Sequence, residues 1–271
     1  MQLRITCFKV FGENDIFLAG HQLGGPQYFA KRYNGSAWTN VTSGGSLVDF
    51  LDVAVSGTDV YVISDRIWDD DMESYLGYPG IIGGDTYTGG GKNFKAVALA
   101  DDGKVYAVGK AGAIVSYSGG SWSAENSHTT KDLTCVAAGG GWVCAAGRDR
   151  TVVCKNDGST WQAVTNLSEK AENKFVGIAW SGGETFVAIH NTGNDGEQSY
   201  IGADKGTIYK IEAGAASLLR TGMSSSLGGI GSDSEGKVAI GGSGGIVYGN
   251  ALPLSEENKG IHPGIYMLLL D

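Results

Sequence analysis

Residues 104–109 read Lys-Val-Tyr-Ala-Val-Gly, a short apolar strand that directly follows the turn Asp101-Asp102-Gly103. The same pattern, a tight and mostly glycine-containing turn followed by a strand of β-branched, aromatic and very small residues, recurs along the chain roughly every 40 to 50 residues. Its six copies span residues 15–20, 59–64, 104–109, 142–147, 185–190 and 237–241. Asp-Gly and Gly-Gly turns supply the positive φ angles that tight hairpins need, so each copy predicts the second strand of a hairpin.

A second short strand, rich in alanine and glycine, precedes each turn. Small side chains suit strands that crowd around a narrow channel, and the repeat length is that of a four-stranded propeller blade. Helical periodicity is nearly absent. The sequence therefore predicts an all-β fold, a single β-propeller domain of about six four-stranded blades, with approximate boundaries 1–45, 46–92, 93–131, 132–173, 174–225 and 226–271.

Composition excludes several classes of protein. The chain has 271 residues, of which 45 are glycine, but the glycines follow no collagen period and apolar residues are plentiful, which also argues against disorder. No apolar run approaches the roughly 18 residues that span a bilayer, so we expect no membrane insertion. The polar residues that interrupt the N-terminus predict no signal peptide, hence a virion or cytoplasmic location. A net charge of −9 argues against nucleic-acid binding.

The four cysteines are interpreted as small buried residues, because a chain without an export signal is expected to stay reduced. Cys144 and Cys154 could face each other across a hairpin that turns at 147–150, but the expected compartment favours free thiols over a disulfide there. No C-x-x-C spacing occurs, so we expect no metal site, and no motif indicates a cofactor.

A third pattern, a strand followed by a glycine turn and a tryptophan, ends at Trp38, Trp122 and Trp161. The last copy, Cys-Lys-Asn-Asp-Gly-Ser-Thr-Trp at 154–161, resembles the Asp-box, S-x-D-x-G-x-T-W, of the sialidase-like (BNR) propellers, from which it departs at Cys154 and Asn156. In that family the box is a structural turn remote from the active site. The resemblance therefore implies a propeller and says little about chemistry.

Propeller geometry predicts which rim carries the function. With the strands of a blade labelled a to d from the axis outwards, the a–b and c–d turns share one rim, and the b–c and d–a connections share the other. The a–b and c–d turns are minimal here, whereas the b–c segments are long, and long loops on a rigid scaffold concentrate binding residues. The predicted recognition rim includes His21 in blade 1 and Asn191, Asn194 and Asp195 in blade 5.

The longest b–c segment, residues 65–78 of blade 2, is the strongest candidate for a binding loop. Its aromatic residues offer large contact area, and its acidic residues offer oxygen ligands for Ca²⁺, although the spacing does not match an EF-hand. The alternative is a solvated acidic loop whose aromatic residues cover the neighbouring blade. The candidate residues are Arg66, Trp68, Asp69, Asp70, Asp71, Glu73, Tyr75 and Tyr78.

No catalytic set can be assembled from the sequence, so we predict that the chain is not an enzyme. A glycosidase needs two carboxylates that flank one bond, and nothing fixes the separation of Asp69 and Asp195. The sialidase-like Arg-Ile-Pro motif is absent, since Arg66-Ile67 is followed by Trp68. His21 and His190 lie in blades that are not neighbours, which argues against a shared metal.

The chain ends in the apolar run Ile265-Tyr266-Met267-Leu268-Leu269-Leu270, which requires burial. It is expected to form the outer strand of the last blade and close the ring, or else to mediate self-association. These features predict a non-catalytic binding and assembly module, for example a structural or attachment component of a phage or virus particle. Its expected partners are other proteins of an assembly or surface glycans. The alternatives are a lectin-like or sialidase-like glycan propeller and an intracellular protein-interaction propeller.

Overall fold

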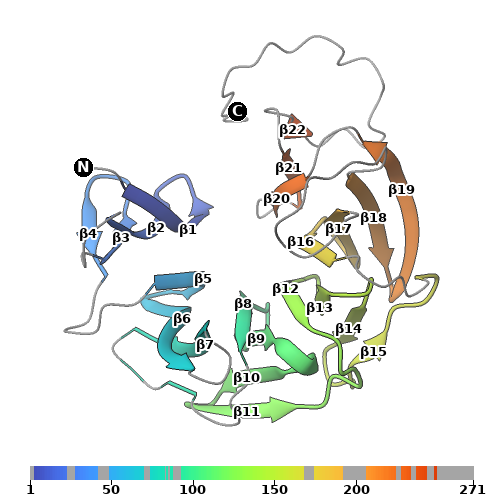
Figure 1. Cartoon of the computed structure of the whole chain (residues 1–271), viewed down its shortest axis with the longest axis horizontal. Helices are drawn as coiled ribbons and strands as arrows, with labels where there is room; N and C mark the ends of the chain where they lie inside the picture. Colours follow the sequence, from blue (N-terminus) through green and yellow to red (C-terminus); the bar gives the residue numbers. More distant parts are fainter. Residues whose placement is uncertain are drawn as a thin grey trace.

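The computed structural model describes residues 3–22, 28–41, 49–69, 74–82, 84, 86–87, 93–167, 174–191, 206–223, 227–232, 236–242 and 247–248. These residues form six antiparallel sheets, of which four have four strands and two have three (Figure 1). The all-β prediction is confirmed. Within the described part of the chain, no helix is long and apolar enough to cross a membrane.

Each sheet is built from consecutive strands and is called a blade below. Blade 1 contains β1 (Leu3–Gly12), β2 (Asp15–Gln22), β3 (Tyr28–Tyr33) and β4 (Trp38–Asn40), and blade 2 contains β5 (Asp49–Ser56), β6 (Asp59–Asp69) and β7 (Ser74–Ile81). Blade 3 contains β8 (Phe94–Leu99), β9 (Val105–Gly109), the 3-10 helix η1 (Lys110–Gly112), β10 (Ile114–Ser118) and β11 (Ser121–Glu125). Blade 4 contains β12 (Leu133–Gly139), β13 (Trp142–Gly147), β14 (Val152–Asn156) and β15 (Gln162–Ala163). Blade 5 contains β16 (Lys174–Trp180), β17 (Thr185–Asn191), β18 (Gly206–Glu212) and β19 (Ala215–Met223), and blade 6 contains β20 (Leu227–Ser232), β21 (Val238–Gly242) and β22 (Val247–Tyr248).

The blades follow one another around a common centre, with the first strand of each blade innermost (Figure 1). Consecutive inner strands contact each other from β1 through β5, β8, β12 and β16 to β20. The six repeat copies found in the sequence form the second strands β2, β6, β9, β13, β17 and β21, so that prediction is confirmed. The rim made by the b–c and d–a connections is called the b–c rim below, and the opposite one the a–b rim.

The core lies between neighbouring blades, where large buried side chains such as Phe17, Phe94 and Phe175 pack. Every inner strand has a register shift near its start, which is typical of a β-bulge. The shifts fall between Ile5 and Cys7, Phe50 and Asp52, Phe94 and Ala96, Leu133 and Cys135, Phe175 and Gly177, and Leu227 and Gly229. The repeated bulge fixes a common register, so residues of different blades can be compared position by position.

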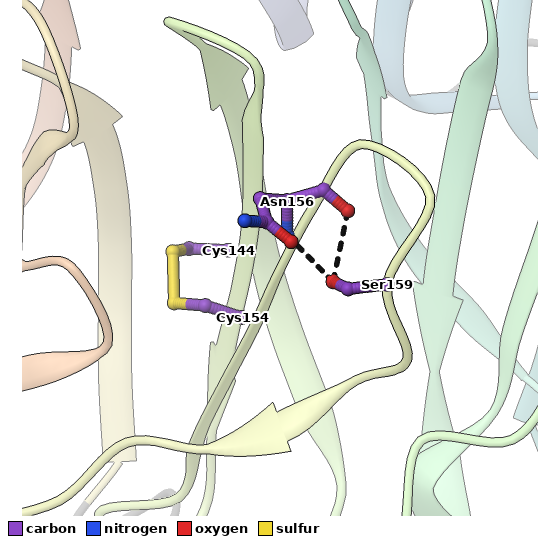
Figure 2. The surroundings of a disulfide bond; sticks show 4 residues. All are labelled: Cys144, Cys154, Asn156 and Ser159. Carbon is purple, nitrogen blue, oxygen red and sulfur yellow. Dashed lines mark hydrogen bonds between the residues drawn. A yellow bond between two sulfur atoms is a disulfide. The ribbon is translucent and has the colours of Figure 1, made fainter.

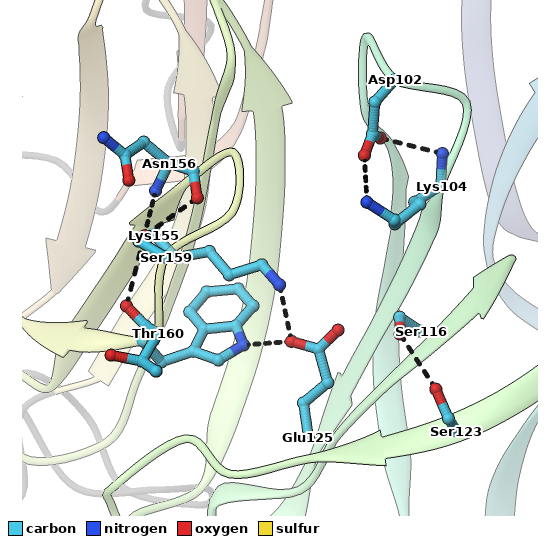
Figure 3. A network of polar contacts seen from close by, with 10 residues as sticks. Asp102, Lys104, Ser116, Ser123, Glu125, Lys155, Asn156, Ser159 and Thr160 are labelled. Atoms are coloured by element: carbon cyan, nitrogen blue, oxygen red, sulfur yellow. Dashed lines mark hydrogen bonds and ion pairs between the residues drawn. The ribbon is translucent and has the colours of Figure 1, made fainter.

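A polar network joins blades 3 and 4 (Figure 3). The Lys155 ammonium lies 2.8 Å from Oε2 of Glu125, and Nε1 of the buried Trp161 donates to the same oxygen at 2.7 Å. Lys155 also lies over the ring of Tyr106, with its ammonium 4.7 Å from the ring centre. The tryptophan of the Asp-box-like segment therefore anchors one blade to the next.

The expectation of four free thiols is wrong for one pair, because Cys144 and Cys154 form a disulfide (Figure 2). The two residues are direct partners in the β13–β14 ladder, and their Cα atoms lie 4.1 Å apart. That separation is typical of the closely spaced, non-hydrogen-bonded pairs of an antiparallel ladder. The expectation of free thiols rested on the expected cellular compartment alone. The direct pairing of the two residues in the ladder brings their sulfur atoms together. Cys7 and Cys135 are buried free thiols, as expected.

Thiol labelling checks this assignment. Burial raises the pKa of the Cys7 and Cys135 thiols to about 12, so both are expected to resist alkylation until the protein unfolds. Without reductant, mass spectrometry of the unfolded protein should show two alkylated cysteines. After reduction it should show four, together with a loss of about 2 kcal/mol in the free energy of unfolding. Four alkylated cysteines without reductant would contradict the disulfide.

Glu125 should contribute to stability in a pH-dependent way. Burial opposes its ionisation, but hydrogen bonds from Lys155, Ser116 and Trp161 outweigh this and hold the pKa of Glu125 below its ordinary value of 4.5. The ionised form therefore stabilises the fold at neutral pH, and this contribution is lost as the pH falls through the lowered pKa. Glu125→Gln should cost about 2 kcal/mol at pH 7, with the difference from the wild type shrinking in acid.

The matched control for this prediction is Glu212→Gln, which removes the exposed Lys210 ion pair. Exposed pairs contribute at most about 1 kcal/mol, so this variant should unfold close to the wild type at every pH. Urea denaturation at several pH values measures both variants. Equal behaviour of the two variants at pH 7 would show that the network does not hold the blades together.

Candidate functional site

The blade-2 segment predicted as a long loop is largely a hairpin. β6 runs to Asp69 and β7 starts at Ser74, and these two residues are ladder partners. A register shift between Asp65 and Ile67 lets the pairing continue beyond the position where the loop was expected to begin, and the aromatic and β-branched residues there favour strand. The loop prediction was therefore wrong for most of residues 65–78.

The structure places the predicted residues of this segment as follows. Tyr78 lies in β7 opposite Ser64 and is buried, with 9% of its surface exposed, so it is not available to a partner. Trp68 and Tyr75 are ladder partners in the same hairpin. Asp70, Asp71 and Glu73 lie outside the described residues, as do the side chains of Arg66, Trp68, Asp69 and Tyr75.

The remaining predicted residues belong to two other blades. His21 is the penultimate residue of β2, where its backbone pairs with Arg4 and Tyr28. Asn191 is the last residue of β17 and pairs with Lys174. Asn194 and Asp195 lie outside the described residues. His21 and Asn191 thus end their strands at the b–c rim, and their side chains lie outside the described residues.

A different group of residues stands out on the b–c rim of blades 3 to 5. Four chain segments meet there: η1, the connection 126–132, the turn 148–151 and the start of β16. The amide of Ala111 donates to Oδ1 of Asp132 at 2.9 Å, and the amide of Arg148 donates to the carbonyl of Asp132 at 2.8 Å. An isolated bridge between Arg148 and Lys174 joins the turn to blade 5. Asp132 is the carboxylate around which the segments are organised.

These segments carry a cluster of cations, called the basic cluster below. Its members are Lys110, Lys131, Arg148, Arg150 and Lys174. Among the described residues of the four segments, only Asp132 and Asp149 oppose them. Lys131 pairs with Asp149 at 2.7 Å, and Arg148 lies 3.5 Å from Asp132. Among the described residues of these four segments, five cations thus stand beside two carboxylates.

The backbone of the basic cluster is strained. Six non-glycine residues of the described chain have positive φ, and four of them lie here: Ala111, His128, Asp149 and Arg150, at 52°, 56°, 55° and 57°. Asp149 and Arg150 are the central residues of a hairpin turn closed by a hydrogen bond from the Thr151 amide to the Arg148 carbonyl. Aspartate is tolerated at the first central position of such a turn, whereas the second favours glycine, so Arg150 costs about 1 kcal/mol there. Strain of this kind often accompanies function.

Arg150 is the most distinctive member of the basic cluster. Its guanidinium carbon lies 6.0 Å from the ring centre of Tyr209 in blade 5, a weak cation–π contact. Its Nε is buried and has no hydrogen-bond partner among the described residues. Buried donors are rarely left unpaired in proteins. A carboxylate that reached this donor would satisfy it.

The a–b rim has the opposite charge. Its described turns and adjoining strand ends carry the carboxylates Glu13, Asp15, Asp59, Asp101, Asp102, Asp157, Glu184 and Glu212, against the cations Lys31, Arg32, Lys104, Lys155, Lys210 and Lys237. Several are paired locally, as in the two-pronged contact of Arg32 with Asp15 at 2.6 and 2.7 Å. In the part of the chain that the structure describes, carboxylates therefore predominate on the a–b rim, and the basic cluster lies on the other rim.

Sequence reasoning missed the basic cluster because its cations come from distant segments of an acidic chain. One local signal was available. The dipeptide Asp149-Arg150 lies between two predicted strands, and a two-residue turn there places both residues at positive φ. Among the described residues, no group of three or more His, Cys, Asp or Glu is placed to hold a metal ion. What the cluster can do chemically is bind carboxylates through charge-assisted hydrogen bonds.

Comparison with known proteins identifies the fold. No protein-family model matches the chain, and no curated protein matches its sequence. Among solved structures, YCF48 bound to a D1 peptide is similar over 91% of this chain and 77% of that one, with 14% identity and a TM-score of 0.56. A mitotic checkpoint complex (88% and 74%, 9% identity, TM-score 0.62) and the Neurospora crassa Pan2 WD40 domain (92% and 76%, 8% identity, TM-score 0.59) are also similar. These likenesses support a propeller-type fold, whereas the sialidase-like resemblance gains no support.

The strained turn makes a prediction about stability. Arg150→Gly should relieve about 1 kcal/mol of backbone strain and lose a cation–π contact of about 0.5–1 kcal/mol. These effects nearly cancel, so the free energy of unfolding should stay within about 1 kcal/mol of the wild type. Ala213→Gly, at the other positive-φ turn of this kind, should stabilise by about 1 kcal/mol because it loses no contact.

Urea denaturation measures both variants. If Arg150→Gly stabilised the protein as much as Ala213→Gly does, the Arg150 side chain would contribute nothing to the fold. A loss of more than about 2 kcal/mol would instead make Arg150 a structural residue and remove the reason to assign it to binding.

Proposed function

We propose that this chain is a non-catalytic, protein-binding propeller that holds an acidic segment of a partner protein on the basic cluster of its b–c rim. The observation that carries the proposal is the convergence of five cations from four chain segments onto one part of a rim, in a protein with a net charge of −9. An acidic chain gains no solubility from concentrating its cations, so their convergence favours a specific partner.

The chemistry of the cluster favours carboxylates over other anions. Its arginines present planar guanidinium groups, and Nε of Arg150 is a buried donor without a partner among the described residues. Guanidinium groups bind carboxylates through paired, charge-assisted hydrogen bonds. The acidic a–b rim would repel the same segment, and this repulsion gives the partner one orientation.

The structural neighbours support a protein partner without identifying it. One of them is YCF48 with a bound peptide, and another belongs to a mitotic checkpoint complex. Of the functions proposed from the sequence, the protein-interaction propeller is therefore favoured. Neither the comparisons nor the described residues bear on the phage-particle or glycan hypotheses.

Charge reversal tests the proposal. A fluorescein-labelled glutamate-rich peptide, and the same peptide with glutamine in place of glutamate, would be titrated with the protein by fluorescence anisotropy at low and high salt. The wild type should bind the glutamate peptide, more weakly at high salt, and should not bind the glutamine peptide. Lys110→Glu with Arg148→Glu should weaken binding by at least about tenfold.

The matched control places the same change on the opposite rim. Lys104→Glu with Lys210→Glu alters the net charge of the protein equally but leaves the basic cluster intact. If both double variants lost the same affinity, only net charge would matter and the proposed site would be wrong. Equal binding of the two peptides by the wild type would show that carboxylates are not recognised. Circular dichroism of each variant confirms that it is folded.

A further inference from the structure

The innermost strand of blade 1 exposes an apolar face. Ile5, Phe8, Val10 and Phe11 have 48%, 56%, 56% and 39% of their surface exposed. In a β-strand, Phe8 and Val10 share one face, and Cys7 and Lys9 share the other. The second face is occupied, since Cys7 packs with residues of blade 2 and Lys9 pairs with Asp52 of blade 2 at 2.7 Å. The face of Phe8 and Val10 is the one turned away from blade 2.

The other blades show what normally covers this face. In each inner strand, the first residue after the bulge faces the next blade. The second residue after the bulge faces the preceding blade. This places Val53 with Cys7, Val136 with Ala96, and Ile178 with Cys135 in shared core clusters. Between blades 5 and 6 the pair is Gly177 and Ile230, and a Cβ atom built on Gly177 would lie 2.5 Å from Cγ2 of Ile230. At these contacts, a small or compact residue of one blade thus packs against a larger residue of the next blade.

One pair in this series is incomplete. The bulge register makes Phe8 the equivalent of Ile230 and Gly229 the equivalent of Gly177. Phe8 is exposed, whereas its buried equivalents Val53 and Ile178 expose 0% and 7% of their surface. A Cβ atom on Gly229 would meet nothing within 4 Å. Both halves of a sixth contact are therefore present, and among the described residues neither has its counterpart.

The rest of the blade-6 face has the shape that this contact requires. Gly229 is the ladder partner of Gly241, and Gly231 is the partner of Ala239, so these residues share one face of β20 and β21. The opposite face carries Leu227, Ile230 and Ile240 and packs with blade 5. The free face thus lacks large side chains, and the free face of blade 1 is lined with them. β1 and β20 stand at the two ends of the series of blades (Figure 1).

We propose that blade 1 packs directly on blade 6 of the same chain, with Phe8 seated on Gly229, and that this contact closes the six sheets into a ring. The occupant of the exposed β1 face is the glycine face of β20 and β21. Burying Phe8 and Val10 there removes apolar surface from water at no steric cost, because no Cβ atom opposes Phe8.

Disulfide trapping tests the contact. Phe8→Cys with Gly229→Cys, in a Cys7→Ala background, should form a disulfide within one chain on mild oxidation, as seen by peptide mass mapping of the monomer isolated by size exclusion. Gly177→Cys with Ile230→Cys is the matched control, since it has the same register at an existing contact. A link only between chains would mean that a second copy covers β1, and no link beside a positive control would mean that another segment intervenes. Either result overturns the proposal.

A stability measurement tests the same contact without cysteines. Phe8→Asp places a charge on the proposed contact and should lower the Tm by about 5 °C or more. Leu218→Asp is the control, because Leu218 is equally exposed, at 55%, but lies in β19 away from the seam; its Tm should change by no more than about 2 °C. An unchanged Tm for Phe8→Asp would show that its side chain stays in water, and closure through this contact would be wrong.

Discussion

Packing between neighbouring inner strands is the interaction on which the rest of this structure depends. The inner strands β5, β8, β12 and β16 each lie against two others near the centre, so their backbones approach one another closely. A small residue on one blade must therefore receive a larger one from the next, as Gly177 receives Ile230. The bulge at the start of every inner strand keeps this pairing in register from blade to blade. The glycine and alanine content of these strands is a consequence of that geometry.

This rigid frame allows the b–c rim to carry strained elements. The hairpin of β13 and β14 ends in the turn that holds Arg148 and Arg150, and the Cys144–Cys154 disulfide links its two strands. A disulfide of this loop length contributes about 2 kcal/mol, which exceeds the cost of about 1 kcal/mol for Arg150 at positive φ. The cross-link and the strained turn thus lie in the same short element.

Charge is distributed in a way that net charge does not reveal. The a–b rim gathers carboxylates because its tight turns use aspartate and glutamate beside glycine, which satisfy local backbone donors and pair with nearby cations. Asp102 illustrates this, since it accepts a hydrogen bond from the Lys104 amide and also pairs with the Lys104 ammonium (Figure 3). The basic cluster lies on the opposite rim, so the proposed partner would meet one attractive and one repulsive surface.

The sequence by itself determined the strands and their order, because hairpin turns and alternation of side chains are local properties that neighbouring residues decide. The inner strands and the six second strands could all be predicted for that reason. The sequence did not determine which distant residues come together at one site, because that depends on how the blades pack against one another. Tyr78 was expected on a binding loop, but it lies buried in β7, and the hairpin of blade 2 extends where a loop was expected. The disulfide needed the register of one ladder, and the basic cluster needed four segments, from Lys110 to Lys174, to meet on one rim. Only tertiary packing sets those distances, since residues far apart along the chain have no local constraint that holds them together.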